Sequence, residues 1–270
     1  MTSPDGTIAA TPIRFDDGEA YERFMGRWSR AAGAVFLDWL GPPSFAHWLD
    51  VGCGTGVFTE LVVEHCAPAT VCAIDPAGPL IATALRRPIA GRASFRMADA
   101  GAMPFADAFF DIVASALVFN FLPDRPRALG EMRRVARPGG LVAGYVWDFA
   151  TERSPSGPLR LGLRRIGREA LPIPGTAATG TDALAAAFRA AGLERIATRV
   201  IDVTEGYADF DDFWNAQTPG FSPATHVVAA LSPADRSRLR DAVRGALPAA
   251  ADGGIRYPAR AHAIMGYVPG

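Results

Sequence analysis

The chain has 270 residues, of which 49% are hydrophobic and 20% charged, a composition typical of a soluble globular protein that excludes a disordered or fibrous one. Its 27 basic residues balance 28 acidic ones, so the net charge of −1 gives no reason to expect a nucleic-acid partner. All of the basic residues are arginine, which excludes a lysine Schiff base and a phosphate loop of the GxxxxGK[ST] type.

The first 17 residues have no basic segment followed by an apolar run, so we expect a tail rather than a signal peptide. A helix rich in aromatic residues follows at 19–40. Further along, apolar clusters of strand length alternate with helix-period segments, the pattern of βαβ units. The expected strands are 47–51, 71–74, 93–97, 109–117 and 141–147, and the expected helices are 57–66, 78–87 and 125–137. Five strands in one run predict a doubly wound parallel sheet.

The alternation weakens after residue 147. Segments rich in proline and glycine surround an arginine-rich helix at 159–170, and a helix at 182–191 leads to a strand near 196–204. A later excursion has helical patterns at 210–217 and 233–247 before a last strand near 259–267. We therefore divide the chain into a tail with a covering helix (1–40), a core (41–150) and the remainder of the sheet (151–270), which carries insertions at 151–180 and 208–250.

The turn after the first strand, DVGCGTGV at 50–57, carries the clearest chemical signal. Its glycines at 52, 54 and 56 allow backbone N–H groups and the next helix N-terminus to approach a ligand. A GxGxxG dinucleotide loop would need a third glycine at position 57, which is Val57, so the turn argues against NAD. Asp75 ends the next strand, where a carboxylate can accept hydrogen bonds from both hydroxyls of a ribose.

Four segments extend this pattern: LDVGCGTG (49–56), AIDP (73–76), ADAGAMPFADAFFDIVAS (98–115) and EMRRVARPGG (131–140). With them the chain resembles the class I S-adenosylmethionine-dependent methyltransferases, in particular the small-molecule group related to the ubiquinone and menaquinone biosynthesis enzymes. The resemblance implies an α/β fold with a seven-stranded, mostly parallel sheet, Rossmann-like and with helical cap insertions. It also implies S-adenosylmethionine as cofactor and S-adenosylhomocysteine as product.

The resemblance assigns roles to the residues of these segments. The glycine turn would line the methionine part of the cofactor, Asp75 would hold the ribose, and Asp99 with the Ala100 amide would bind the adenine edge. Asp99 has an alternative role as a helix N-cap. The first helix would close over the cofactor or merely pack on the core. The full expected set of cofactor contacts is Tyr21, Arg27, Arg30, Asp50, Gly52, Gly54, Gly56, Asp75, Pro76, Asp99, Ala100, Ser115 and Ala116.

The acceptor is expected to be a small molecule, apolar or aromatic. The chain has Asn120-Phe121 where many relatives carry two histidines, and it lacks the [ND]PP[YF] motif of many nucleic-acid methylating relatives. The aromatic residues of 208–250 either line an acceptor pocket or form a small core that holds the excursion on the sheet. The arginines of 159–170 either bind an acidic acceptor or form a solvated face. The residues expected to bind the acceptor are Phe210, Phe213, Trp214 and Phe221.

Methyl transfer from a sulfonium is an in-line displacement, so the enzyme mainly has to position the acceptor. If a base is needed, His226 is the expected catalytic residue, with His262 and Asp148 as further candidates, whereas His47 and His65 are expected to be structural. Cys53, Cys66 and Cys72 form no CxxC pair, so neither a metal site nor a disulfide is expected.

No apolar run reaches the ~18 residues that span a bilayer. We expect a cytoplasmic monomer or homodimer. The alternatives are an oxidoreductase that binds NAD or a nucleotide sugar, and a catalytically idle regulator that binds S-adenosylmethionine.

Overall fold

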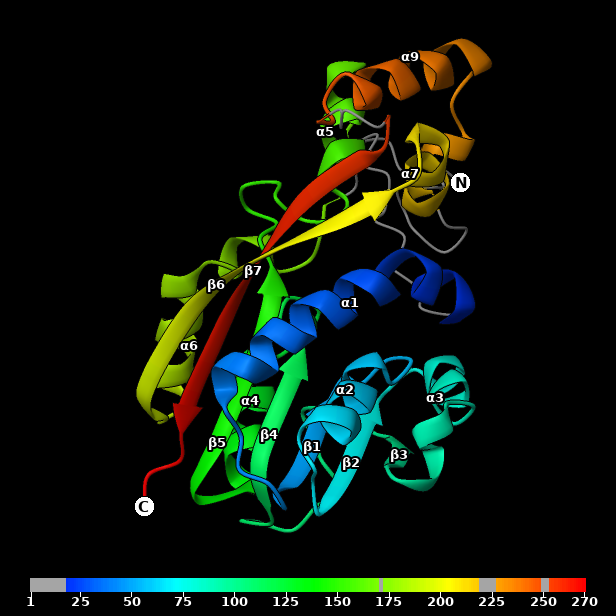
Figure 1. Ribbon diagram of the computed structural model, residues 1–270. Helices are drawn as coiled ribbons and strands as arrows, with labels where there is room; N and C mark the ends of the chain where they lie inside the picture. Colours follow the sequence, from blue (N-terminus) through cyan, green and yellow to red (C-terminus); the bar gives the residue numbers. More distant parts are fainter. Residues whose placement is uncertain (1–17, 170–171, 219–226, 249–252) are drawn as a thin grey trace, which may run out of the picture.

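The computed structural model describes residues 18–169, 172–218, 227–248 and 253–270 (Figure 1). A seven-stranded sheet has the order β3-β2-β1-β4-β5-β7-β6. β7 runs antiparallel to both of its neighbours, and the pairs from β3 to β5 are parallel. The predicted mostly parallel, doubly wound sheet is therefore confirmed. The strands are β1 (His47–Val51), β2 (Thr70–Asp75), β3 (Ser94–Met97), β4 (Phe110–Ala116), β5 (Ala136–Trp147), β6 (Glu194–Tyr207) and β7 (Ile255–Tyr267).

Helices cover both faces of the sheet, so each face has its own core. Alternate residues of β5 point to opposite faces: Tyr145 packs with Trp28 and Phe36 on one side, and Val146 with Phe188 on the other. Short 3-10 turns lie at 88–91 and 176–178. The helices are α1 (Gly18–Leu40), α2 (Val57–His65), α3 (Gly78–Ala84), α4 (Arg125–Val135), α5 (Gly157–Arg165), α6 (Thr181–Ala190), α7 (Phe210–Gln217) and α9 (Pro233–Arg244).

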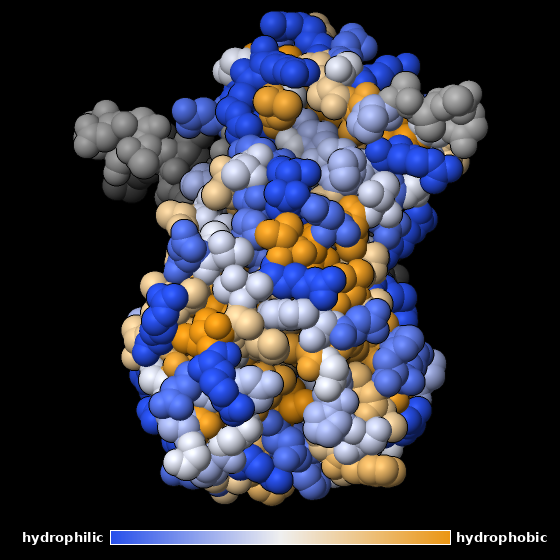
Figure 2. Space-filling view, turned by 60° about the vertical axis from the view of Figure 1, so that its left-hand side comes forward, coloured by the Kyte–Doolittle hydropathy of each residue, from blue (hydrophilic) through white to orange (hydrophobic). Residues whose placement is uncertain are grey.

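The last two strands are longer than the sequence predicts, because both continue beyond the rest of the sheet (Figure 1). The far end of this hairpin carries α5, α7 and α9, which we call the cap. Within it α5 crosses α9 closely: a Cβ added to Gly162 would lie 2.6 Å from Val243 Cγ2. In Figure 2 the cap stands above a broader lower body, and hydrophilic and hydrophobic residues are mixed on the face shown.

β6 forms one edge of the sheet and pairs with β7 along nearly its whole length. Charged side chains recur along it, and Arg199 and Asp202 are exposed. In the described part of the chain, no helix combines the length and the apolar character needed to span a membrane.

Candidate active site

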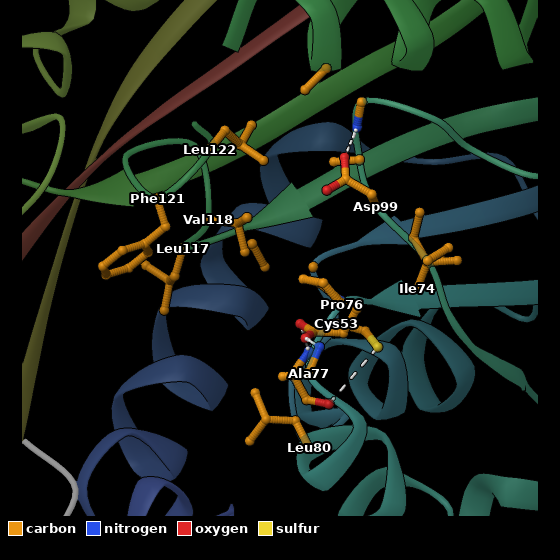
Figure 3. Close-up of a pocket in the computed structure, with 18 of the residues that line it drawn as sticks. Cys53, Ile74, Pro76, Ala77, Leu80, Asp99, Leu117, Val118, Phe121 and Leu122 are labelled. Carbon is orange, nitrogen blue, oxygen red and sulfur yellow. Dashed lines mark hydrogen bonds between the residues drawn. The ribbon is translucent and has the colours of Figure 1, made fainter. Parts of the chain in front are cut away.

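A cavity of about 570 Å³ lies at the carboxyl edge of β1, β2 and β4 (Figure 3). Ligands of open α/β sheets bind at this edge. The cavity is lined by the turns after β1 to β4 together with residues of α1, α2, α3, α4 and β5. It brings together seven residues of the predicted cofactor set: Gly52, Gly54, Asp75, Pro76, Asp99, Ala100 and Ala116.

The glycine turn needs a backbone that other residues rarely adopt. Gly52 and Gly54 have φ values of 76° and 55°, in the left-handed region that glycine enters without penalty. A Cβ on Gly52 would also lie 2.6 Å from Val118 Cγ2. The turn is tied to β2, because the N–H groups of Gly52 and Cys53 donate to the Ile74 carbonyl at 2.7 and 2.9 Å.

Asp75 links two of the turns around the cavity. Its Oδ2 accepts a hydrogen bond from the Gly54 N–H at 3.0 Å, and its Oδ1 accepts one from the Ala77 N–H at 2.8 Å. Burial raises the pKa of this carboxyl, and the two amide bonds oppose the rise. A carboxylate oxygen has two lone pairs, so each oxygen can still accept a hydrogen bond from a ligand.

Two buried polar atoms beside the glycine turn have no partner in the described structure: Asp50 Oδ1 and Thr55 Oγ1. Asp50 does not line the cavity; its Oδ2 accepts a hydrogen bond from Thr59 Oγ1 at 2.7 Å. Burial raises the pKa of Asp50 to about 7; the charge of Asp75 adds to the rise, and the Thr59 bond opposes it. Buried polar groups are nearly always paired, so such atoms mark a place where a ligand or water completes the structure.

Asp99 lies on the opposite side of the cavity from Leu117 and Phe121 (Figure 3). Its Oδ1 accepts a hydrogen bond from the Gly101 N–H at 2.6 Å, and Arg127 Nε donates to the Gly101 carbonyl at 2.7 Å. Residues 99–102 form a turn rather than the start of a helix, so the helix N-cap alternative for Asp99 is wrong.

The other end of the cavity is apolar, and the residues that form its wall are not among those predicted to bind the cofactor or the acceptor. It is built by the segment that follows β4, together with Tyr145 of β5 and Ser29 of α1. Leu117 has a φ of 64°, and its N–H donates to the Tyr145 carbonyl at 2.8 Å. The sequence did hold a signal for this wall, because the segment directly follows the fourth strand at its carboxyl end. Its apolar members are Leu117, Val118, Phe121, Leu122 and Pro123.

Three other predicted cofactor residues lie outside the lining of the cavity. Ser115 Oγ donates to the Val51 carbonyl at 3.0 Å, inside the sheet. Arg30 pairs with Glu60 and Glu64 of α2. Arg27 is exposed.

Gly56 also lies outside the lining. A Cβ there would meet Ala84, Arg87 and Phe95, each at 3.3 Å, on the side of α3 and β3. The side chain of Tyr21, and the whole of Phe221 and His226, lie outside the described residues, so their predicted roles stay predictions.

The aromatic residues of α7 pack away from the cavity lining. Phe213 is fully buried, with its ring centroid 5.0 Å from that of Tyr207 and 6.2 Å from that of Tyr257. Phe210 and Trp214 are buried beside it. This arrangement favours the small core over the acceptor pocket.

The arginines of α5 and the residues after it bind nearby carboxylates. Arg160 and Arg164 both pair with Glu152, and Arg168 pairs with Asp235. These contacts favour a structural face over a site for an acidic acceptor.

The remaining candidate bases also lie outside the cavity lining. His262 Nδ1 lies 2.8 Å from the Thr179 carbonyl oxygen, and its Nε2 lies 3.8 Å from Asp148 Oδ2. His47, at the amino end of β1, contacts Thr70 Oγ1 at 2.8 Å on the opposite edge of the sheet. Among the described residues, no three side chains are arranged as ligands for a metal ion.

Comparison with known proteins places this geometry in a family. A family described as "Methyltransferase domain" matches residues 49–144. The chain is 36% identical over 146 residues to a malonyl-[acyl-carrier protein] O-methyltransferase of Methylococcus capsulatus, a match that covers 54% of this chain and 51% of that protein. It is also 36% identical over 156 residues to a demethylmenaquinone methyltransferase of Thermus thermophilus, covering 57% of this chain and 67% of that protein.

The fold agrees with these matches. Phosphoethanolamine N-methyltransferase 2 of Haemonchus contortus, solved with S-adenosyl-L-methionine, superposes with a TM-score of 0.57 and 16% identity over 99% of this chain and 62% of that chain. The chain spans about half the length of the first curated relatives that it matches. From the strand order, the glycine turn and these matches together, we conclude that the chain belongs to the class I S-adenosylmethionine-dependent methyltransferases.

Proposed function

We propose that the protein transfers a methyl group from S-adenosylmethionine to a small molecule held at the apolar end of the cavity. The observation that carries this proposal is that one cavity joins the glycine turn and Asp75 to the apolar segment after β4. A cofactor at the first end would present its sulfonium toward an acceptor at the second.

The residues present fit the cofactor. The glycine turn and the unpartnered Thr55 hydroxyl suit its methionine part, and Asp75 can accept hydrogen bonds from its ribose. At the far side, Asp99 and the Ala100 amide suit the edge of adenine. Asp50, behind the turn and outside the cavity lining, has a carboxyl group near the expected position of the amino group, whose positive charge would favour the ionised form of Asp50.

When bound, S-adenosylmethionine supplies an activated methyl group on a positively charged sulfur. The residues of this chain hold the acceptor in line with that methyl, and the apolar wall keeps water away from it. Ser29 and Tyr145 also line this end, and the Tyr145 hydroxyl donates to the Ser29 carbonyl at 3.5 Å, which ties α1 to the wall beside the acceptor.

The names of the two relatives suggest different acceptors, a carrier-bound malonyl group and a demethylmenaquinone. We favour the quinone class, reduced to the quinol. A carboxylate enclosed by the apolar wall would lose its hydration at a cost of several kcal/mol, because the guanidinium of Arg127, which also lines the cavity, is bound to the Gly101 carbonyl on the Asp99 side.

Calorimetry with S-adenosylmethionine, S-adenosylhomocysteine and NAD tests the cofactor. Binding of the first two and not of NAD is expected, and the opposite result would refute the proposal. Turnover of a demethylmenaquinol, compared with that of a malonyl thioester, then tests the acceptor class. A protein that binds S-adenosylmethionine but methylates no acceptor of either class would instead support the idle regulator.

A further inference from the structure

Arg87, which follows α3, touches three parts of the molecule that surround the cavity. Its Nε donates to the carbonyl of Thr55 in the glycine turn. Its Nη1 donates to Glu60 Oε2 of α2 at 2.8 Å, and its Nη2 donates to Glu22 Oε1 of α1 at 2.7 Å. One planar group therefore connects the turn, α2 and α1, as only the fixed fork of a guanidinium can.

The three contacts differ in burial, and this makes them separable by mutation. The side chains of Arg87 and Glu60 are only 10% and 8% exposed, whereas that of Glu22 is 43% exposed. Loss of one partner from a buried ion pair leaves an uncompensated charge and strongly destabilises a protein. Loss of a half-exposed partner has little effect on stability.

The glycine turn packs directly against this arginine. A Cβ on Gly56 would lie 3.3 Å from Arg87 Cδ, and Gly56 has a φ of 84°. The third glycine of the motif thus makes room for the arginine stem as well as for Ala84 and Phe95, which lie equally close. The carbonyl of the neighbouring Thr55 accepts a hydrogen bond from Arg87. Thr55 also lines the cavity, with its hydroxyl buried and without a partner among the described residues.

We propose that Arg87 is a positioning residue for methyl transfer, which couples the glycine turn to the helix that covers the cavity. By holding the Thr55 carbonyl it keeps the turn in its ligand-binding form, and by holding Glu22 it fastens α1, which contributes Ser29 to the cavity wall. This inference rests on the proposed function, since the ligand that is enclosed is the cofactor.

The test compares Arg87→Lys and Glu22→Gln with the wild type and with the control Arg92→Lys. Lysine keeps a charge for Glu60, but its compact ammonium lacks the planar fork that reaches the turn, α2 and α1 at the same time. Glu22→Gln removes the charge through which Arg87 holds α1 and leaves the pairs of Arg30 with Glu60 and Glu64 in place. Arg92 is a matched control, because its Nη2 donates to the Val63 carbonyl of α2 at 3.2 Å. Calorimetry gives the affinity for S-adenosylhomocysteine, and hydrogen exchange gives the protection of backbone amides 22–36 with and without it.

We expect Arg87→Lys to weaken the affinity at least tenfold, and Glu22→Gln to weaken it about threefold. In both variants the ligand should no longer slow exchange in 22–36, while Arg92→Lys behaves as wild type. A wild type that does not bind S-adenosylhomocysteine would overturn the proposed function, and this inference with it. A wild type that binds, with Arg87→Lys and Glu22→Gln equal to it in affinity and exchange, would overturn this inference alone.

Discussion

At the residue scale, Asp75 combines a structural role with its proposed role in the ribose site. Asp75→Ala should weaken binding of S-adenosylhomocysteine by about 30- to 150-fold, which corresponds to the roughly 2 to 3 kcal/mol of a charge-assisted contact to two hydroxyls. Calorimetry on the folded variant measures this. Asp111→Ala is the control, because Asp111 also accepts a backbone hydrogen bond, from the His47 N–H at 2.7 Å, but at the other edge of the sheet. Equal affinities in Asp75→Ala and wild type would refute the ribose assignment.

The raised pKa of Asp50 predicts that the stability of the folded protein depends on pH. Its pKa of about 7 in the folded protein, raised by burial, lies above the ordinary value of 3.8. The unfolded chain therefore loses this proton first as the pH rises. The stabilisation from a protonated Asp50 is fully present below pH 3.8 and is lost as the pH rises through 7. Asp50→Asn removes this dependence, and the asparagine carbonyl can still accept the Thr59 hydrogen bond.

The expected consequence is that wild type loses about 2 to 3 kcal/mol more stability than Asp50→Asn between pH 5 and pH 8. Urea denaturation of both proteins at the two pH values, without ligand, measures the difference. Parallel losses would show that Asp50 is ionised in the folded protein across this range.

At the scale of elements, a substitution in α7 distinguishes a small core from an acceptor pocket. Trp214 is 6% exposed and packs beside Phe210, at 6.1 Å between ring centroids. Trp214→Ala should lower the free energy of unfolding by roughly 3 to 5 kcal/mol and leave the affinity for S-adenosylhomocysteine unchanged. Phe45→Ala, at a residue 79% exposed, should have almost no effect on stability. If Trp214→Ala keeps full stability but loses at least tenfold in kcat/KM for the acceptor, the pocket interpretation is right after all.

The close crossing of α5 and α9 depends on Gly162, which has no side chain. Gly162→Ala should destabilise the protein by about 1 to 3 kcal/mol, because the new methyl group would overlap Val243 and Leu239. Gly130→Ala, in the middle of α4 with no atom within 4 Å of its Cβ position, should instead stabilise by about 0.5 to 1 kcal/mol. Thermal or chemical denaturation measures both. A stabilising Gly162→Ala would show that the two helices can move apart without cost.

At the scale of the whole molecule, the sequence predicts best what depends on local pattern. β1 and α7 have the predicted bounds, because each is a short apolar or amphipathic run with clear turn residues on either side. The carboxyl-edge positions of Gly52, Asp75 and Asp99 could also be predicted, since a parallel sheet brings the ends of its strands together.

What the sequence did not reveal depends on contacts between distant segments. The extra length of β6 and β7 comes from their pairing with each other beyond the sheet, which neither strand shows alone. β5 begins at Ala136, where the sequence pattern predicts the last turn of a helix. The first residues of β5 pair with β4 in an irregular register, which depends on contacts with β4 and is not visible in the local pattern. Gly56 fits the family motif, yet the space beside it is filled by Ala84, Arg87 and Phe95, which lie 28 to 39 positions further along the chain.

The open edge of β6 has a consequence for behaviour in concentrated solution. Within the described part of the chain, this strand of 14 residues has one unpaired side, which offers a second chain a row of backbone hydrogen-bonding groups. Arg199, Asp202 and Glu205 stand along this strand, and their charges would have to be stripped of water before another backbone came within 5 Å. The same charges that contribute nothing to the cavity thus oppose self-assembly through strand addition.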